Sequence, residues 1–274
     1  MMQPPPADIS PALATVPRIA SLVPSLTELV VRLGLAPHLV ARTGYCIHPA
    51  QSLALVPKVG GTKDVNLAKL RRLAPTHVLL NVDENRRETV DALHGWGADA
   101  PQLVVTHPLA PQDNLALVEQ LVAVFGHVGG VRERADTLAA DLRHELALTR
   151  PEVHAPQRVL YLIWREPWMT VARNTYLSSM LALVNWHSLP ATQGGASGAA
   201  RYPVVQGTEA WLPEVQRVLL SSEPYAFGDA HLAEARRLCP NARATLVDGE
   251  LLSWYGARAV PGLRYLRTLA GEPG

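Results

Sequence analysis

The chain has few cysteines, no excess of charge of either sign and no long apolar run. Cys46 and Cys239 are far apart and predict two reduced thiols of a cytosolic protein, with no role assigned to either. The 25 Lys and Arg balance 24 Asp and Glu, so a basic surface for nucleic acid or an anionic membrane is not expected. No stretch reaches the ~20 apolar residues of a transmembrane helix.

The N-terminal segment also lacks the features of an export signal. Met1 to Ala14 is rich in proline and has neither a basic start nor an apolar core. We therefore expect residues 1–16 to be a disordered tail and the protein to be cytoplasmic. A true start further upstream would instead place it in the periplasm or on the cell surface.

Catalytic and metal-binding motifs are missing as well. The sequence contains no G-x-S-x-G, H-E-x-x-H, Walker or G-x-G-x-x-G motif. The run from Gly60 to Lys63 is followed by Asp64, where a phosphate-binding loop requires Ser or Thr. His48, His107 and His187 lie in expected loops but have no zinc-ligand spacing. We expect no catalytic residue, no metal ligand and no intrinsic cofactor.

What the sequence does contain is an alternation of strand-like and helix-like segments. Hydrophobic residues make up 48% of the chain, enough for a sizeable core. Short apolar runs suit buried parallel strands, and periodic runs between them suit helices, with Ser25 and Glu28 as a capping box. The expected strands are 18–23, 39–43, 77–81, 102–106, 158–164, 217–221 and 244–248, and the expected helices are 26–33, 67–73, 85–94, 114–125, 176–184, 230–238 and 261–269.

One helix is longer than the others and divides the two series of strands. Residues 131–148 contain no Gly or Pro, and at ~1.5 Å per residue they form a helix of roughly 27 Å, about the width of a small domain. We predict an α/β fold of two Rossmann-like lobes with parallel sheets, 17–127 and 151–274, joined by a single long helix within 128–150. The apolar positions of this helix, at steps of four and three, are Val131, Ala135, Leu138, Leu142 and Leu146.

Aromatic residues are concentrated in the second half, directly after predicted strands. Of 15 Trp, Tyr and Phe residues, twelve follow the long helix. Ligands of open α/β sheets bind at the carboxyl ends of strands, so these rings predict a site for a broad, partly apolar ligand between the lobes. The alternative is that the rings close each lobe's core. The candidate ligand-binding residues here are Trp164, Arg165, Trp168, Tyr202, Tyr225, Asp248, Trp254 and Tyr255, and those of the first half are Tyr45 and Lys63.

The first half resembles a known family. The run Ser21-Leu-Val-Pro-Ser-Leu-Thr-Glu-Leu, then Tyr45, Val59-Gly-Gly-Thr-Lys-Asp-Val-Asn-Leu and Leu73-Ala-Pro-Thr-His-Val-Leu-Leu resemble the N-terminal lobe of helical-backbone (class III) substrate-binding proteins of cobalamin and iron-chelate importers. The resemblance extends over roughly residues 18–269. It implies a non-catalytic receptor that holds a corrinoid, haem or iron–siderophore in a shallow cleft, with little hinge motion.

The resemblance also bears on single positions. Tyr45 falls at a ligand-contacting tyrosine, and the loop with Lys63 falls where the cobalamin receptor has a tryptophan that is absent here. The segment from Asp248 to Trp254 matches a cleft-lining loop with an acid and a tryptophan. The two glutamates that dock such receptors on an ABC permease correspond to Ala68 and Thr208, which argues against standard docking.

These observations leave several functions open. The leading hypothesis is a cytosolic protein that stores, traffics or senses a small-molecule ligand such as cobalamin, haem or a ferric chelate. The first alternative is the exported substrate-binding component of an ABC importer. The second is an enzyme that acts on a corrinoid-like compound, and the third is a regulatory module that binds a protein through its aromatic face.

Overall fold

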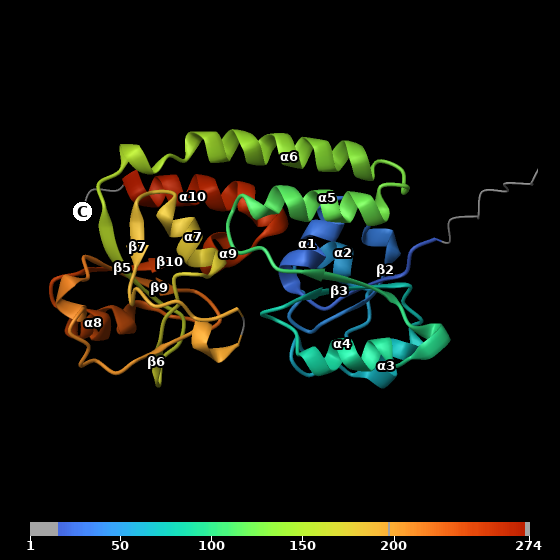
Figure 1. Cartoon of the computed structure of the whole chain (residues 1–274), viewed down its shortest axis with the longest axis horizontal. Coiled ribbons are helices and arrows are strands. Elements are labelled where there is room, and N and C mark those ends of the chain that lie inside the picture. The colour runs from blue at the N-terminus through green and yellow to red at the C-terminus, as the bar shows by residue number, and fades with distance from the viewer. Residues whose placement is uncertain (1–15, 197, 272–274) are drawn as a thin grey trace, which may run out of the picture.

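The computed structural model describes residues 16–196 and 198–271, so nearly all of the expected N-terminal tail lies outside the described residues. Figure 1 shows two α/β lobes side by side, with one long helix along one side of both. Each lobe contains a four-stranded parallel sheet, as the strand and helix alternation predicts. The predicted fold class is therefore confirmed, while the boundaries 17–127, 128–150 and 151–274 stay a prediction.

The N-terminal sheet has the strand order β2-β1-β3-β4, with helices on both faces. In β3, Val78 and Leu80 contribute to one hydrophobic cluster and Leu79 to another, because successive side chains of a strand point to opposite faces. Both faces are therefore apolar, as in other parallel sheets. The elements are β1 (Ile19–Ser21), α1 (Pro24–Arg32), β2 (Leu39–Arg42), α2 (Ala50–Leu53), α3 (Leu67–Arg72), β3 (His77–Asn81), α4 (Arg87–His94), β4 (Gln102–Thr106) and α5 (Asp113–Phe125).

The C-terminal sheet has the order β10-β9-β5-β7 and repeats this plan. Along β5, Leu160 and Leu162 belong to one cluster and Val159 and Tyr161 to another. Two short strands, β6 and β8, pair antiparallel and form a separate two-stranded sheet. The elements are β5 (Gln157–Leu162), β6 (Trp168–Met169), α7 (Tyr176–Ala182), β7 (Trp186–Ser188), β8 (Val204–Val205), β9 (Arg217–Ser221), α8 (Asp229–Leu238), β10 (Arg243–Val247), α9 (Gly249–Ser253) and α10 (Ala259–Gly271).

The long helix is α6 (Val131–Leu148), with the bounds that the sequence predicts. It packs against α5 of the N-terminal lobe and α10 of the C-terminal lobe. Glu145 is only 3% exposed and forms ion pairs with Arg264 at 2.6 Å and Arg267 at 2.5 Å, both on α10. This helix is thus fixed to the C-terminal lobe by a buried carboxylate as well as by apolar contacts.

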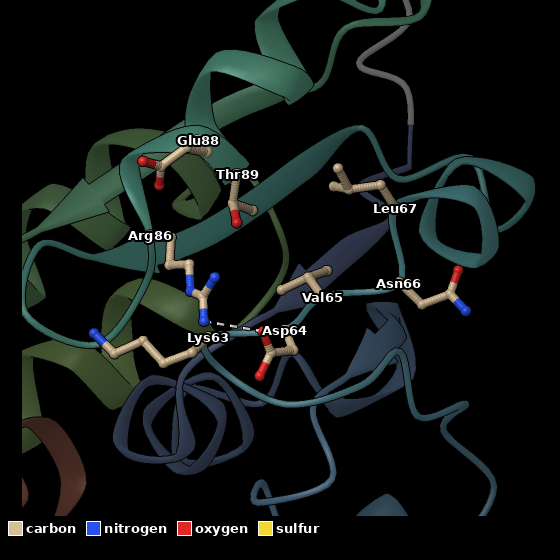
Figure 2. Close-up of a pocket in the computed structure, with 8 residues that line it drawn as sticks. All are labelled: Lys63, Asp64, Val65, Asn66, Leu67, Arg86, Glu88 and Thr89. Atoms are coloured by element: carbon tan, nitrogen blue, oxygen red, sulfur yellow. Dashed lines mark ion pairs between the residues drawn. The ribbon is translucent and has the colours of Figure 1, made fainter.

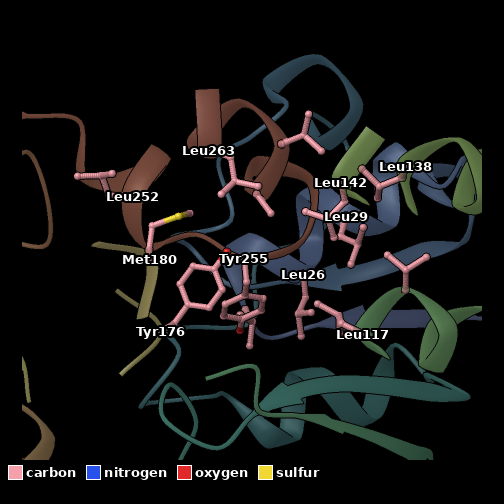
Figure 3. Packing of buried hydrophobic residues seen from close by; sticks show 14 of the residues in the cluster. Leu26, Leu29, Leu117, Leu138, Leu142, Tyr176, Met180, Leu252, Tyr255 and Leu263 are labelled. Carbon is pink, nitrogen blue, oxygen red and sulfur yellow. The ribbon is translucent and has the colours of Figure 1, made fainter. Parts of the chain in front are cut away.

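The lobes share one hydrophobic core in addition to the connecting helix. Leu29 of α1 and Met180 of α7 belong to the same cluster, with Tyr255 between the lobes (Figure 3). The one-turn helix Gly256–Arg258 packs against α1. Gly256 has φ +77°, and a Cβ there would lie 3.2 Å from the Leu29 side chain, so this close approach requires glycine. The connection between the lobes is therefore wider than a single helix.

One local prediction is wrong. The helix expected at 26–33 begins at Pro24, and its N-cap residue, Val23, makes no side-chain capping bond. Pro24 takes the first helical position because its fixed φ suits it and its missing N–H costs nothing there. Ser25 consequently lies inside the first turn, where it is buried, and does not form the expected capping box with Glu28.

Candidate functional site

The loops at the carboxyl ends of the N-terminal strands are fastened to one another. Lys63 Nζ donates to the Asp83 carbonyl at 2.7 Å, and Asn85 Nδ2 donates to the Thr62 carbonyl at 3.0 Å. Asn85 is buried and also donates to the Leu22 carbonyl at 3.2 Å. These hydrogen bonds therefore join the loops that follow β1, β2 and β3 into one continuous surface. It lies at the sheet edge where ligands of this fold class bind.

Tyr45 lies on this surface. Its side chain is 67% exposed, and a Cβ added to Gly61 would lie 3.3 Å from its ring, so the ring adjoins the loop that carries Lys63. The predicted pair Tyr45 and Lys63 thus occupies neighbouring loops.

In the C-terminal lobe, aromatic residues gather in what we call the C-lobe aromatic cluster, formed by Trp164, Trp168, Tyr225 and Phe227. The Tyr225 and Phe227 rings are 4.7 Å apart, Trp164 lies 5.7 Å from Tyr225, and Trp168 stacks on Phe227 at 5.9 Å. Arg165 lies over Trp168, with its guanidinium carbon 4.7 Å from the ring. Four predicted residues are therefore brought together, because the loops after β5 and β9 belong to adjacent strands.

Trp254 does not join this cluster and lies where the two lobes meet. Its Nε1 donates to Glu223 at 2.6 Å, and Arg258 lies over its ring at 4.7 Å. His48 of the N-terminal lobe meets the same ring edge-on, with centroids 6.0 Å apart. The aromatic residues expected at one site therefore form two separate groups.

Two predicted residues take structural positions instead of lining exposed loops. Tyr255 is 6% exposed, and its hydroxyl donates to Glu84 of the N-terminal lobe at 2.9 Å. Asp248 is the N-cap of α9 and accepts from the Leu251 amide at 2.9 Å. Neither position is evident from the sequence, because one depends on contact between lobes and the other on a five-residue helix.

A buried ion pair also crosses between the lobes. Arg201 is 1% exposed and its Nε lies 3.2 Å from Asp83 Oδ1. The neighbouring Tyr202 is partly buried; this burial, together with the Asp83 charge, raises the pKa of its hydroxyl to about 12. Tyr202 therefore stays a neutral hydrogen-bonding group at this junction. The only sequence signal for Asp83 is its place directly after a predicted strand.

Two carboxyl groups of the junction bind protons more tightly than usual. Burial raises the pKa of Glu84 to about 7, against the hydrogen bond from Tyr255, and the negative charge of Glu223 adds to the increase. The pKa of Glu223 is raised by burial, although Ser253 and Trp254 donate to it. The described residues hold no group of three or more His, Cys, Asp or Glu suited to a metal, so we assign no metal centre here.

Exposed apolar side chains occur on the carboxyl-end loops of both lobes. In the N-terminal lobe they are Tyr45, Ile47 and Val82, at 67%, 50% and 40% exposure. In the C-terminal lobe, Trp164 in the loop after β5 is 40% exposed, and Val204 in strand β8 is 41% exposed.

Two hollows lie outside this junction. One, of about 410 Å³, is formed entirely by the N-terminal lobe (Figure 2). Another, of about 590 Å³, lies between α1, α6 and the start of α10. The first hollow is lined by Lys63, Asp64, Val65, Asn66, Leu67, Arg86, Glu88 and Thr89.

The chain matches no protein-family model. It is 25% identical over 169 residues to a vitamin B12-binding protein of Photorhabdus laumondii, which covers 61% of this chain and 58% of that protein. It is 26% identical over 184 residues to the uncharacterized ABC transporter substrate-binding lipoprotein YvrC of Bacillus subtilis, which covers 65% and 57%. The matched region thus spans less than two thirds of either relative.

Solved structures match over nearly their whole length. The periplasmic vitamin B12-binding protein BtuF of Vibrio cholerae superposes with a TM-score of 0.74 at 19% identity, covering 93% of this chain and 98% of that chain. The periplasmic heme-binding protein HutB of the same organism gives 0.74 at 22% identity, covering 94% and 100%. RhuT, a periplasmic heme-binding protein of Roseiflexus sp. RS-1, gives 0.71 at 20% identity, covering 93% and 97%.

These relatives are binding proteins and not enzymes. The resemblance seen in the sequence is therefore confirmed, and the chain has the two-lobed fold of the helical-backbone substrate-binding proteins.

Proposed function

We propose that the protein is a non-catalytic solute-binding protein that holds a corrinoid or metal chelate, such as cobalamin, haem or an iron–siderophore, between its lobes. The observation that carries this proposal is the exposed apolar surface on carboxyl-end loops of both lobes, with Tyr45 and Val82 on one and Trp164 on the other. Exposed apolar groups at such loops favour a ligand that covers them.

The junction is also suited to a large, rigid ligand. Contacts such as Tyr255 with Glu84 and Arg201 with Asp83 hold the lobes in a fixed relation before any ligand binds. Preorganisation of this kind lowers the entropy cost of binding. Lys63 supplies positive charge in the loop beside Tyr45, which suits carboxylate or phosphate groups on the ligand's edge, whereas Arg165 is paired with Glu234 and Glu166.

The relatives support the ligand class. The names of those found by sequence and by structure include vitamin B12 and heme as ligands. Both are broad, flat metal chelates. Within the C-lobe aromatic cluster, Trp164 is 40% exposed and offers a flat apolar surface to such molecules, whereas Phe227 is buried and stacks on Trp168.

A second candidate function is the substrate-binding component of an ABC importer. The relation to an ABC transporter substrate-binding lipoprotein favours it. Ala68 and Thr208, which are both exposed, stand where docking glutamates are expected and argue against it. The cytosolic location stays a prediction, and fractionation of cells that express the full gene tests it.

The proposed function is tested by adding cobalamin, haem or a ferric siderophore to the purified protein. We expect one of the three to change its visible spectrum and to raise the Tm. A ligand at 100 times its Kd stabilises the folded state by about 2.7 kcal/mol, a rise on the order of 5–10 °C for a chain of this size. If none of the three ligands changes either quantity, the proposal is contradicted.

A further inference from the structure

The hollow of about 410 Å³ in the N-terminal lobe has a lining that the proposed function does not use. Its walls are the loop 63–67 and the first turn of α4, so no residue of the C-terminal lobe contributes (Figure 2). Three kinds of donor border it, namely a hydroxyl, a guanidinium and the start of a helix.

Thr89 is the innermost of these donors. It is 7% exposed and lines the hollow, and Figure 2 shows its hydroxyl directed toward the space between Arg86 and Val65. Within residues 16–196 and 198–271, no hydrogen-bond partner is found for Thr89 Oγ1. The oxygen is not one of the fully buried side-chain atoms without a partner, so it is open to the space of the hollow. A polar ligand atom in the hollow would supply that partner.

Positive charge borders the same space. Lys63 and Arg86 both line the hollow. Arg86 is also the N-cap of α4, and its side chain makes no capping bond within the described structure. The first N–H groups of a helix have no acceptor inside the helix and favour an anion. Together, the guanidinium and the helix start favour a negatively charged group beside Thr89, whereas the Lys63 ammonium is directed away from Thr89 toward the Asp83 carbonyl (Figure 2).

Two carboxylates also border the hollow, and they limit the negative charge of an anion that could bind there. Asp64 pairs with Arg86 at 3.1 Å, but the two side chains are 81% and 55% exposed, and such pairs contribute little free energy. A ligand anion can therefore replace Asp64 as the partner of Arg86. Glu88 also lines the hollow, so a group with two negative charges would be repelled more than a group with one.

We propose that this hollow binds a singly charged oxyanion, a carboxylate or a phosphodiester, through Thr89, Arg86 and the start of α4. The site is distinct from the apolar junction and its existence does not rest on the proposed function. Lys63 connects the two regions, since its Nζ also donates to the carbonyl of Asp83 beside the buried ion pair between the lobes. A large ligand with an anionic side arm would reach both.

The test is a titration of the isotope-labelled protein, followed by NMR, with two probe anions and their neutral analogues. Acetate and dimethyl phosphate are the anions, and acetamide and trimethyl phosphate are the controls. We expect saturable shifts of the Arg87, Glu88 and Thr89 amides with one or both anions and with neither control. Whichever anion binds more tightly identifies the source of the oxyanion. Shifts that do not saturate, or that the neutral probes reproduce, overturn the proposal.

Three variants sharpen the titration. Thr89→Val keeps the shape but removes the hydroxyl, so we expect affinity to fall about tenfold, as for loss of a hydrogen bond to a charged group, while the Tm is unchanged or higher. Arg86→Gln weakens binding similarly. Arg236, on α8 of the C-terminal lobe, is exposed and does not line the hollow, so Arg236→Gln leaves the affinity unchanged. A lower Tm for Thr89→Val, or unchanged affinity, shows that the hydroxyl has a structural role and contradicts the site.

Discussion

Two carboxyl groups in this protein, the buried Glu145 and the partly buried Glu84, have opposite electrostatic surroundings. Glu145, on the connecting helix α6, is buried, which opposes its charge, yet the hydrogen bonds and charges of Arg264 and Arg267 prevail and lower its pKa. Glu84, between the lobes, accepts its hydrogen bond from the neutral hydroxyl of Tyr255, and burial raises its pKa to about 7. The helix is held by an ionised carboxylate, whereas Glu84 at the lobe junction, close to the paired Asp83, favours the protonated form.

The contacts that these two carboxyl groups make therefore depend on pH in opposite ways. The contact between α6 and α10 has its full strength at neutral pH. The contact from Tyr255 to Glu84 is made to a carboxyl whose charge is unfavourable at that place. A ligand that brings a positive or hydrogen-bonding group to the junction would relieve this cost.

The largest expected effect comes from breaking the core that both regions share. Leu29→Ala removes a fully buried side chain of α1 beside Gly256, which should lower the free energy of unfolding by about 2–5 kcal/mol. Five of the six tryptophans lie in the C-terminal lobe, so their fluorescence reports that lobe. We expect their denaturant transition to shift with the substitution in the N-terminal lobe.

The matched control is Leu55→Ala, because that leucine is 96% exposed. It should change the free energy of unfolding by less than about 0.5 kcal/mol. A tryptophan transition that stays at the wild-type denaturant concentration in Leu29→Ala, while circular dichroism reports an earlier one, would show that the lobes unfold separately.

The next largest effect concerns Glu145. Because its pKa is lowered, ionised Glu145 stabilises the folded protein when the pH is above its ordinary pKa of 4.5. This stabilisation is lost as the pH falls through the pKa of the folded state. Glu145→Gln should therefore lower the free energy of unfolding by about 2–4 kcal/mol at pH 7, and by less in acid. Urea unfolding at several pH values measures this, with the exposed Glu133→Gln of the same helix as control. An equal loss at all pH values contradicts the ionised state.

A smaller effect of opposite sign is expected for Glu84. Its raised pKa means that stability is present below the ordinary value of 4.5 and is lost as the pH rises toward about 7. Glu84→Gln removes this loss. The free energy of unfolding of the variant should therefore exceed that of the wild type by about 1–3 kcal/mol at pH 8 and equal it near pH 4.5. The difference in free energy of unfolding between the two proteins from pH 4 to 9 decides the question, and a difference independent of pH refutes it.

Most of the fold is predictable because it depends on local periodicity. The bounds of β3, β4, β9 and α6 coincide with the predicted ones, since buried parallel strands are continuous apolar runs and an amphipathic helix has a clear period. β7 has three residues and gives no such pattern. The start of α1 depends on Pro24 and not on the serine that follows it.

The site is predictable only in part, for a physical reason. Trp164, Trp168 and Tyr225 come together because the carboxyl ends of neighbouring strands share an edge, a rule that acts within one sheet. Tyr255 and Glu84 meet across two lobes, and no local pattern specifies that contact. The role of Asp248 as a helix cap also depends on α9, whose five residues are too few to show a period.

The central claim is that one ligand contacts both lobes, and affinities of single variants test it most directly. Tyr45→Ala and Trp164→Ala each remove an exposed ring from a different lobe, so the Tm without ligand should change little. With whichever of cobalamin, haem or ferric siderophore binds the wild type, a spectroscopic titration should show each variant weakened by about 5- to 100-fold, since an aromatic contact contributes ~1–3 kcal/mol. If only one variant loses affinity while the other binds like the wild type, the ligand lies on a single lobe and the claim is contradicted.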